Sequence, residues 1–301
     1  MARTARLARA ALAVAVLIGL SACGADFGDV PSNGRSLTIG SLSGFDNQVV
    51  AQVYGQALAA QGYEVDYNTG IGSRKNYLVG LQNGVIDFVP EYAGLLLESV
   101  SPGADDTDID TIMTALPIGL DPLDLAVLQP ASAKKSRVFV VTRAFAEAHS
   151  IVSIRDLAPV ASAITIGSAE NLESSSYGRR SLEFAYGVSN WVFRSAPDEP
   201  TVVDDLLANT VQVADLSTTD PAIIEQDLVE LKDPSNVITA QNLVPVLNNK
   251  TLSPGLAAII NPITAAIKTE DLAAFSTFDD ELASTVAHRW LIDHSFITLD
   301  D

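Results

Sequence analysis

Residues 36–92 read SLTIGSLSGFDNQVVAQVYGQALAAQGYEVDYNTGIGSRKNYLVGLQNGVIDFVPEY, and this stretch decides the fold. Apolar residues at 37–39 predict a short strand, and apolar residues at three- and four-residue spacing between 49 and 58 predict a helix. Alternation at 63–67 predicts a second strand, the residues near 77–81 a second helix, and 86–89 a third strand. Because a strand, helix, strand, helix, strand order favours right-handed crossovers, it predicts an α/β fold with a largely parallel sheet.

A second α/β series follows an acidic stretch at 105–110 and a polar connection at 130–136. We expect its strands at 138–142, 164–166, 191–193, 211–214 and 228–231, with helices near 182–184 and 203–207. Two such series predict two lobes that face each other across a cleft. Ligands of α/β sheets bind beyond the carboxyl ends of the strands, so the loops that begin at Gly40, Asn68, Pro90, Gly167 and Asp215 are the places to search for a site.

The first 22 residues have the pattern of a secretory signal peptide. Arg3, Arg6 and Arg9 precede an apolar run at 10–20, which is too short to cross a bilayer. The run ends in Leu20-Ser21-Ala22-Cys23, which resembles a bacterial lipobox. Cys23 is the only cysteine and therefore has no partner for an internal disulfide. We expect lipidation of Cys23, a flexible tether at 23–35, and a location outside the cytoplasm on the cell membrane.

The chain is strongly acidic, with 18 Lys plus Arg against 37 Asp plus Glu and a net charge of −19. Removal of the three arginines of the signal peptide leaves 15 basic residues and a net charge of −22. Such a surface repels phosphate backbones, so nucleic acid is excluded as a partner. A hydrophobic content of 48% is ample for a folded core.

No catalytic or metal-binding motif is present in the sequence. It contains no G-x-S-x-G, no phosphate-binding G-x-x-x-x-G-K and no H-E-x-x-H. Its three histidines are His149, His288 and His294, and none has a cysteine or a cluster of carboxylates beside it. We therefore expect a protein that is not an enzyme and that holds neither a cofactor nor a metal.

Short motifs along nearly the whole mature chain are similar to those of substrate-binding proteins of ABC-type osmoprotectant importers, which take up glycine betaine, choline and carnitine. The similarity lies in the order and spacing of Ile39-Gly40-Ser41, Phe45, Gln48, Gly62-Tyr63, Gly72-Ser73, Ile86-Asp87, Pro90-Glu91-Tyr92 with Gly94, Ser153-Ile154-Arg155-Asp156-Leu157-Ala158-Pro159, Leu182-Glu183, Tyr186-Gly187, Thr218-Thr219-Asp220, and Asn242 with Pro245-Val246.

The resemblance implies a two-lobed α/β fold of the periplasmic-binding-protein type, with two hinge strands and a central ligand cleft. By analogy, residues 36–130 and 240–301 form the first lobe and residues 131–239 the second. The implied function is capture of a small solute by lobe closure and its delivery to an ABC permease with a cytoplasmic ATPase. We expect a monomer.

In relatives that bind quaternary ammonium compounds, several aromatic side chains surround the cation and an arginine binds the carboxylate. Carried over to this sequence, Tyr92 matches one aromatic position, but the others fall on Arg137, Ser217 and Gln241. The arginine position falls near Ser175, with Arg179 or Arg180 as nearby substitutes.

A single aromatic residue and an arginine at a cation position favour a ligand other than a simple betaine. A polyol, a phenolic compound stacked on Tyr92, or a carboxylate would fit. Arg74 or Arg137 would be the charged anchor of such a ligand. The full set of candidate ligand-binding residues is Ser41, Phe45, Ser73, Arg74, Tyr92, Arg137, Ser175, Ser217, Thr218 and Gln241.

Several of these residues also have structural interpretations. Ser73 and Arg74 begin a helix, where serine commonly caps the first turn. Phe45 could pack on the helix that follows it, Tyr92 could pack at a strand end, and Arg137 could pair with a carboxylate. Two other classes of function stay open, namely a surface lipoprotein that uses the same fold for sensing or adhesion, and a hydrolase with a reactive serine.

Overall fold

The computed structural model describes residues 36–277 and 282–298. The predicted signal peptide at 1–22, Cys23 and the tether at 23–35 lie outside the described residues. Within the described ranges, every helix is too short or too polar to cross a bilayer.

The first sheet has five strands in the order β2-β1-β3-β10-β4. Strand β1 runs parallel to β2 and β3, whereas β10 runs antiparallel to both β3 and β4. Every residue of β10 is buried, as expected for a strand with a neighbour on each side. The bounds are β1 Ser36–Leu42, β2 Glu64–Ile71, β3 Phe88–Tyr92, β4 Leu125–Val127 and β10 Leu243–Asn248.

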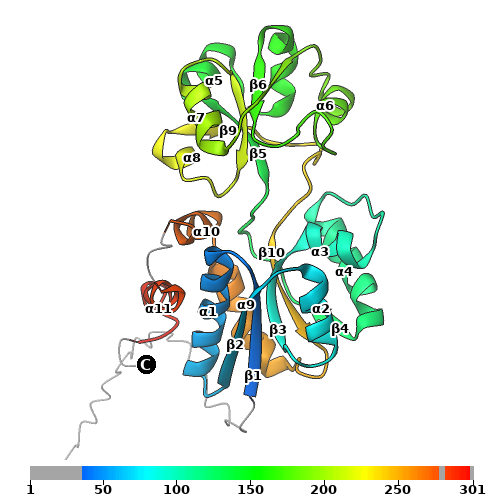
Figure 1. The fold of residues 1–301 in the computed structure, drawn as a ribbon, viewed down its shortest axis with the longest axis vertical. Coiled ribbons are helices and arrows are strands. Elements are labelled where there is room, and N and C mark those ends of the chain that lie inside the picture. The colour runs from blue at the N-terminus through cyan, green and yellow to red at the C-terminus, as the bar shows by residue number, and fades with distance from the viewer. Residues whose placement is uncertain (1–35, 278–281, 299–301) are drawn as a thin grey trace, which may run out of the picture. The chain divides into compact units, whose positions relative to one another are not determined.

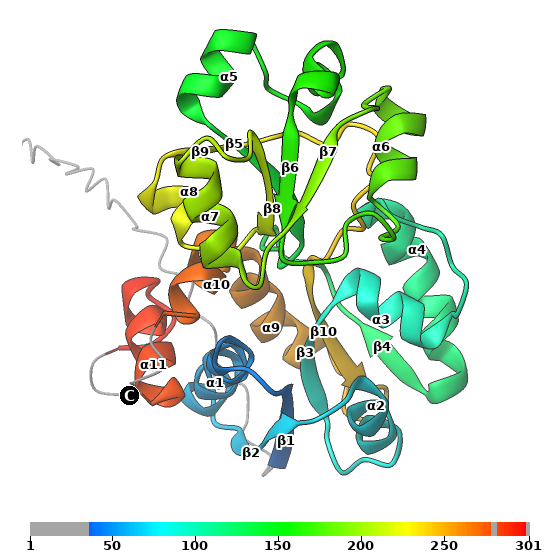
Figure 2. The same ribbon diagram turned by 45° about the horizontal axis from the view of Figure 1, so that its top comes forward.

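Each face of the first sheet is covered by its own helices, as Figure 2 shows. A hydrophobic core lies on each face of the sheet, and alternate residues of β3 point into them: Phe88 and Tyr92 into the first core, and Val89 into the other. In the first core Tyr54 meets Phe88 edge to face at 5.0 Å, and the Tyr54 hydroxyl bonds to Thr264 at 2.8 Å. Helices α1 Phe45–Ala60, α9 Pro254–Ala266, α10 Thr269–Phe275 and α11 Ala283–Asp293 cover this core, and α2 Arg74–Gln82, α3 Ala93–Val100 and α4 Ile109–Leu120 cover the other.

The second sheet has five strands in the order β7-β6-β8-β5-β9. Strand β6 is parallel to β7 and β8, and β5 is antiparallel to β8 and β9. Its strands are β5 Arg137–Thr142, β6 Thr165–Ser168, β7 Val192–Ser195, β8 Val213–Ser217 and β9 Leu228–Glu230. Its helices are α5 Arg143–His149, the 3-10 segment Ile154–Ala163, α6 Arg179–Tyr186, α7 Glu199–Leu207 and α8 Ala222–Glu225.

The sequence predicts a largely parallel sheet from residues 36–92, and β1, β2 and β3 are parallel as expected. Each sheet as a whole is mixed, because four of its strands run in one direction and one strand, β10 in the first sheet and β5 in the second, runs in the other. Strands β5 and β10 begin directly after the chain has passed from one sheet to the other. They enter without a crossover helix and run antiparallel to their neighbours.

Two extended segments, at 131–136 and 231–242, connect the sheets (Figure 1). They are hydrogen-bonded to each other: the Lys135 amide donates to the Gln241 carbonyl at 3.0 Å, and the Ser136 hydroxyl to the Thr239 carbonyl at 3.0 Å. The first sheet draws its strands from 36–130 and 240–301, and the second from 131–239. The lobe boundaries at these positions stay a prediction.

Candidate functional site

Polar side chains gather at the carboxyl ends of the strands of each sheet, where an α/β fold places its ligands. We call the group on the second sheet the Asp215 cluster; it consists of Arg137, Ser168, Tyr177, Glu199, Asp215 and Ser217. On the first sheet, Lys135 from the connecting segment pairs with Asp46, the charge of Asp46 acts on Tyr92, and Ser41 lies on the strand next to that of Tyr92; we call these four residues the Asp46 cluster.

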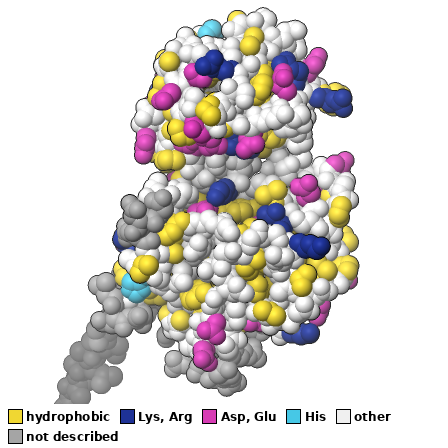
Figure 3. Space-filling view, in the orientation of Figure 1, with side chains coloured by type: hydrophobic (Ala, Val, Ile, Leu, Met, Phe, Trp, Pro, Cys, Tyr) yellow, Lys and Arg dark blue, Asp and Glu magenta, His cyan; other side chains and the backbone are white. Residues whose placement is uncertain are grey.

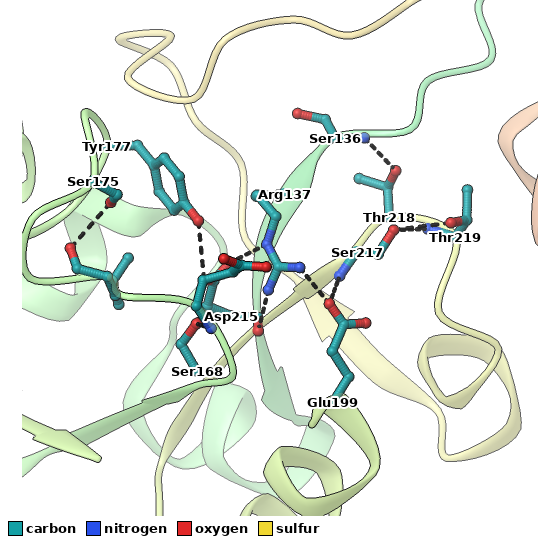
Figure 4. A network of polar contacts seen from close by, with 12 residues as sticks. Ser136, Arg137, Ser168, Ser175, Tyr177, Glu199, Asp215, Ser217, Thr218 and Thr219 are labelled. Carbon is teal, nitrogen blue, oxygen red and sulfur yellow. Dashed lines mark hydrogen bonds and ion pairs between the residues drawn. The ribbon is translucent and has the colours of Figure 1, made fainter. Parts of the chain in front are cut away.

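Arg137 is held at the centre of the Asp215 cluster by two carboxylates, as Figure 4 shows. Its Nε donates to Asp215 Oδ1 at 3.1 Å, a terminal nitrogen donates to the Asp215 carbonyl at 2.7 Å, and the other pairs with Glu199. The second carboxylate oxygen of Asp215 accepts from Ser168 at 2.7 Å and from Tyr177 at 3.2 Å. Asp215 is fully buried, and these four bonds satisfy its carbonyl and both carboxylate oxygens.

The Asp215 cluster carries an excess of negative charge. Burial would lower the pKa of Arg137, but the charges of Asp215 and Glu199 outweigh burial and raise that pKa, so the guanidinium stays ionised. Burial raises the pKa of Asp215, although Arg137 opposes this shift. Burial also raises the pKa of nearby Asp220, and Glu199 adds to the rise. One cation therefore faces Asp215 and Glu199 together, and a free anion gains little from it.

The hydroxyl groups of the second sheet that are predicted to bind ligand already make hydrogen bonds within the protein. Ser217, opposite Arg137 in the sheet, bonds to the Thr219 hydroxyl at 2.9 Å. The Thr218 hydroxyl donates to the Lys134 carbonyl at 2.9 Å and accepts from the Ser136 amide at 3.1 Å. Ser175 donates to the Leu172 carbonyl at 3.0 Å. The structure therefore brings Arg137, Ser217 and Thr218 together, with Ser175 in the loop that leads to Tyr177.

The Asp46 cluster differs, because two of its buried hydroxyl groups have no hydrogen-bond partner among the described residues. These are Ser41 Oγ and the Tyr92 hydroxyl, on side chains that are 1% and 6% exposed. They lie on the neighbouring strands β1 and β3. Burial raises the pKa of Tyr92 well above its usual value, and the charge of Asp46 raises it further. Asp46, in the first turn of α1, pairs with Lys135 at 2.6 Å.

Arg74 also has a carboxylate partner, on the other face of β3. Its Nε and a terminal nitrogen each lie 3.0 Å from the Glu91 carboxylate, which is fully buried and also accepts from the Tyr92 amide at 2.7 Å. Ser73 caps α2 by accepting a hydrogen bond from the Asn76 amide at 3.3 Å. Both contacts correspond to the structural interpretations of these residues.

Phe45 and Gln241 lie near the sheet ends but are engaged in packing and capping. Phe45 begins α1 and packs against the first core. The Gln241 side-chain carbonyl accepts from the Leu95 amide at 3.0 Å in the first turn of α3. At Gly94, a Cβ would lie 2.8 Å from the Gln241 amide nitrogen and 2.7 Å from the Ala240 carbonyl, so glycine permits this close approach. The second connecting segment is thereby fastened to α3.

Sequence reasoning missed the carboxylates that neutralise the predicted anchors. Glu199 carries no motif, and Glu91 belongs to Pro90-Glu91-Tyr92, but nothing in the sequence indicates that they pair with Arg137 and Arg74, because both pairings depend on tertiary contacts. Only Asp215 is indicated by the sequence, because it begins one of the loops in which a ligand site is expected. Among residues 36–277 and 282–298, no group of three or more histidine, cysteine or acidic side chains is arranged to hold a metal.

A cavity of about 280 Å³ lies at the opposite end of β1 from Ser41. It is lined by Ser36, Leu37, Tyr63, Lys250, Thr251 and Leu256, and it contains no residue of either cluster. On the face drawn in Figure 3, hydrophobic side chains are dispersed, and basic and acidic ones are interspersed.

Two mixed sheets joined by two extended segments, with polar clusters at their strand ends, make up a fold of the periplasmic-binding-protein type. The chain matches the family described as the substrate-binding domain of ABC-type glycine betaine transport systems over residues 35–293, and it belongs to that family. The expected fold class and the resemblance drawn from the sequence are thus confirmed. A search of curated protein sequences finds no match.

Solved structures share the fold at low sequence identity. A protein described as a glycine betaine/carnitine/choline ABC transporter is 21% identical, with a TM-score of 0.78, and the match covers 87% of this chain and 99% of that one. Apo YehZ from Escherichia coli is 19% identical, with a TM-score of 0.73 and the same coverage. The lactococcal OpuAC in complex with glycine betaine is 16% identical, with a TM-score of 0.51, and the match covers 87% of this chain and 96% of that one.

Replacing Arg74 with methionine tests whether its main role is to neutralise Glu91. Arg74→Met leaves a buried carboxylate without its partner, and we expect a loss of about 3–5 kcal/mol in the free energy of unfolding. The double variant Arg74→Met/Glu91→Gln removes that charge and should recover most of the loss. Urea unfolding with an unchanged m-value measures both. Equal destabilisation of the single and double variants would contradict the pairing role.

Proposed function

We propose that this chain is the lipid-anchored solute-binding protein of an ABC importer of the osmoprotectant-uptake type, located outside the cytoplasm. The observation that carries the proposal is the family match over residues 35–293. The two doubly connected sheets agree with it, because such an arrangement lets two halves close on a guest without unfolding either. The partners would be a small solute, an ABC permease and its cytoplasmic ATPase.

The residues at the strand ends favour an uncharged, hydroxyl-bearing solute, such as a polyol or a phenolic compound. Arg74 and Arg137, the two candidate anchors for a carboxylate, are each paired with carboxylates of the protein itself. In contrast, the buried hydroxyl groups of Ser41 and Tyr92 have no hydrogen-bond partner within residues 36–277 and 282–298. Leaving such groups unpaired costs about 1–3 kcal/mol each, so a solute that bonds to them gains affinity. A carboxylate ligand therefore receives less support.

Closure is the proposed mechanism, and it requires no bond-making. The two connecting segments sample more open and more closed arrangements, and a solute touches both clusters only when they approach each other. A ligand with more contacts in one state shifts the population toward that state. The closed form would be the one that docks on the permease.

A thermal-shift panel of polyols, phenolics, aromatic acids, betaines and choline tests the proposed function. A solute present at a hundred times its Kd should stabilise the folded protein by about 2.7 kcal/mol, and the Tm should rise accordingly. Small-angle scattering with the same solute should show a smaller radius of gyration. If no solute of the panel raises the Tm or compacts the protein, the proposal is wrong. A dominant response to glycine betaine would overturn the ligand class alone.

Replacing Tyr92 with phenylalanine should separate stability from binding. Tyr92→Phe removes a buried hydroxyl that has no partner among the described residues, so the free energy of unfolding should rise by about 1 kcal/mol. Affinity for the best solute of the panel should fall about tenfold, measured by calorimetry. Tyr54→Phe is the matched control in the same core: its hydroxyl bonds to Thr264, so this change should cost about 1 kcal/mol without altering affinity. A Tyr92→Phe protein that binds normally would remove Tyr92 from the site.

Cys23→Ser tests the lipid anchor. The full chain, expressed in a bacterial host fed a labelled fatty acid, should incorporate label and fractionate with membranes, because two acyl chains give stable anchoring. Cys23→Ser should carry no label and appear in the soluble fraction. Ser21→Ala, which keeps a small residue before the cysteine, should behave as the parent protein does. Membrane fractionation of Cys23→Ser would contradict the anchor.

A further inference from the structure

The connecting segment at 131–136 and the strand after it carry a cation for each sheet. Lys135 pairs with Asp46 of α1, on the first sheet, and Arg137 pairs with Asp215 and Glu199 on the second. Ser136 between them bonds instead to Thr218 and Thr239. In extended chain, residues two apart project to the same side. One short stretch of chain therefore supplies internal counterions to the acidic groups at both strand ends.

Lys135 places its ammonium group directly against the carboxylate of the Asp46 cluster. Asp46 is 5% exposed, and its Oδ2 lies 2.6 Å from the Lys135 ammonium group. The same cluster contains the hydroxyls of Ser41 and Tyr92, which have no partner in the part of the chain that the structure describes. A buried carboxylate beside an aromatic ring would ordinarily attract an organic cation. Here the ammonium group of the protein satisfies that carboxylate and leaves the neutral hydroxyls for the ligand.

We propose that Lys135 is a specificity-determining residue that excludes organic cations from the Asp46 cluster and reserves the site for uncharged, hydroxyl-bearing solutes. This inference rests on the proposed solute-binding function. Lys135 acts by occupying Asp46, so loss of its charge should open the site to an external cation. The fastening of the segment by Ser136 and by the Lys135 amide keeps the ammonium group within reach of Asp46.

Two probes of one shape isolate the effect of ligand charge. Choline carries a quaternary ammonium group, and 3,3-dimethylbutan-1-ol replaces its nitrogen with carbon and is uncharged. Calorimetry with the parent protein should give choline no advantage over the alcohol. For Lys135→Met, choline affinity should rise at least tenfold, whereas affinity for the alcohol should stay unchanged. The double variant Lys135→Met/Asp46→Asn should lose the gain, because the carboxylate that binds the cation is gone.

Matched variants show whether the effect belongs to Lys135. Lys134→Met removes the same charge from the exposed neighbouring residue and should leave both affinities unchanged. Lys135→Arg keeps a cation beside Asp46 and should also show no gain. Thermal melts establish that each variant is folded, and Lys135→Met/Asp46→Asn lacks the unpaired charge that could destabilise the single variant.

The outcomes separate this inference from the proposed function. An unchanged ratio of choline to alcohol affinity in folded Lys135→Met overturns the role of Lys135, even if solutes of the panel bind. An equal gain in Lys134→Met overturns it as well, since net charge alone would then explain the result. Tight binding of choline by the parent protein shows that Lys135 excludes nothing. If neither protein binds any solute, the proposed function falls and the inference falls with it.

Discussion

Strand β10 lies between β3 and β4, bonds to both, and is buried along its whole length, so the chain that returns from the second sheet enters the first as an interior strand. Its last residue, Asn248, donates to the Leu81 carbonyl and accepts from the Lys250 amide, which ties the strand end to α2 and to the turn after it. The first connecting segment leaves the sheet after β4 and the second enters it at β10, so the pairing of these two strands holds one end of each segment in place. This limits the positions that Lys135 and Gln241 can occupy.

Much of the fold could be predicted from the sequence, because the spacing of apolar residues indicates which face of a helix or strand is buried. The strands and helices between 36 and 92 follow their apolar spacing, and Gly62 and Gly84 lie just beyond helix ends with positive φ. The sequence pattern does not predict helix α4, because its first residues belong to the acidic stretch at 105–110 and Pro117 lies inside the helix. The antiparallel entry of β5 and β10 was also missed, because local patterns do not report the direction of a neighbouring strand.

The candidate site was harder to predict than the fold. Ser41 and Tyr92 lie near strand ends, where an α/β fold places its ligands, and their hydroxyls have no partner among the described residues. Ser73 and Ser175 fit the same pattern, but their hydroxyls bond to backbone three residues away, and the Thr218 hydroxyl bonds to the Lys134 carbonyl in the connecting segment. Short polar side chains serve turns and caps as readily as ligands, and only tertiary contacts distinguish these uses. The same holds for the arginines, whose counterions come from distant segments.

The burial of β10 also sets an order of events during folding. The second sheet is assembled from one continuous stretch, residues 137–230, and can form as soon as that stretch is available. The first sheet cannot close until residues 243–248 arrive, because β4 is attached to β3 only through β10. Contacts between residues so far apart in sequence form slowly. The half of the protein that is synthesised first is thus the half that is completed last.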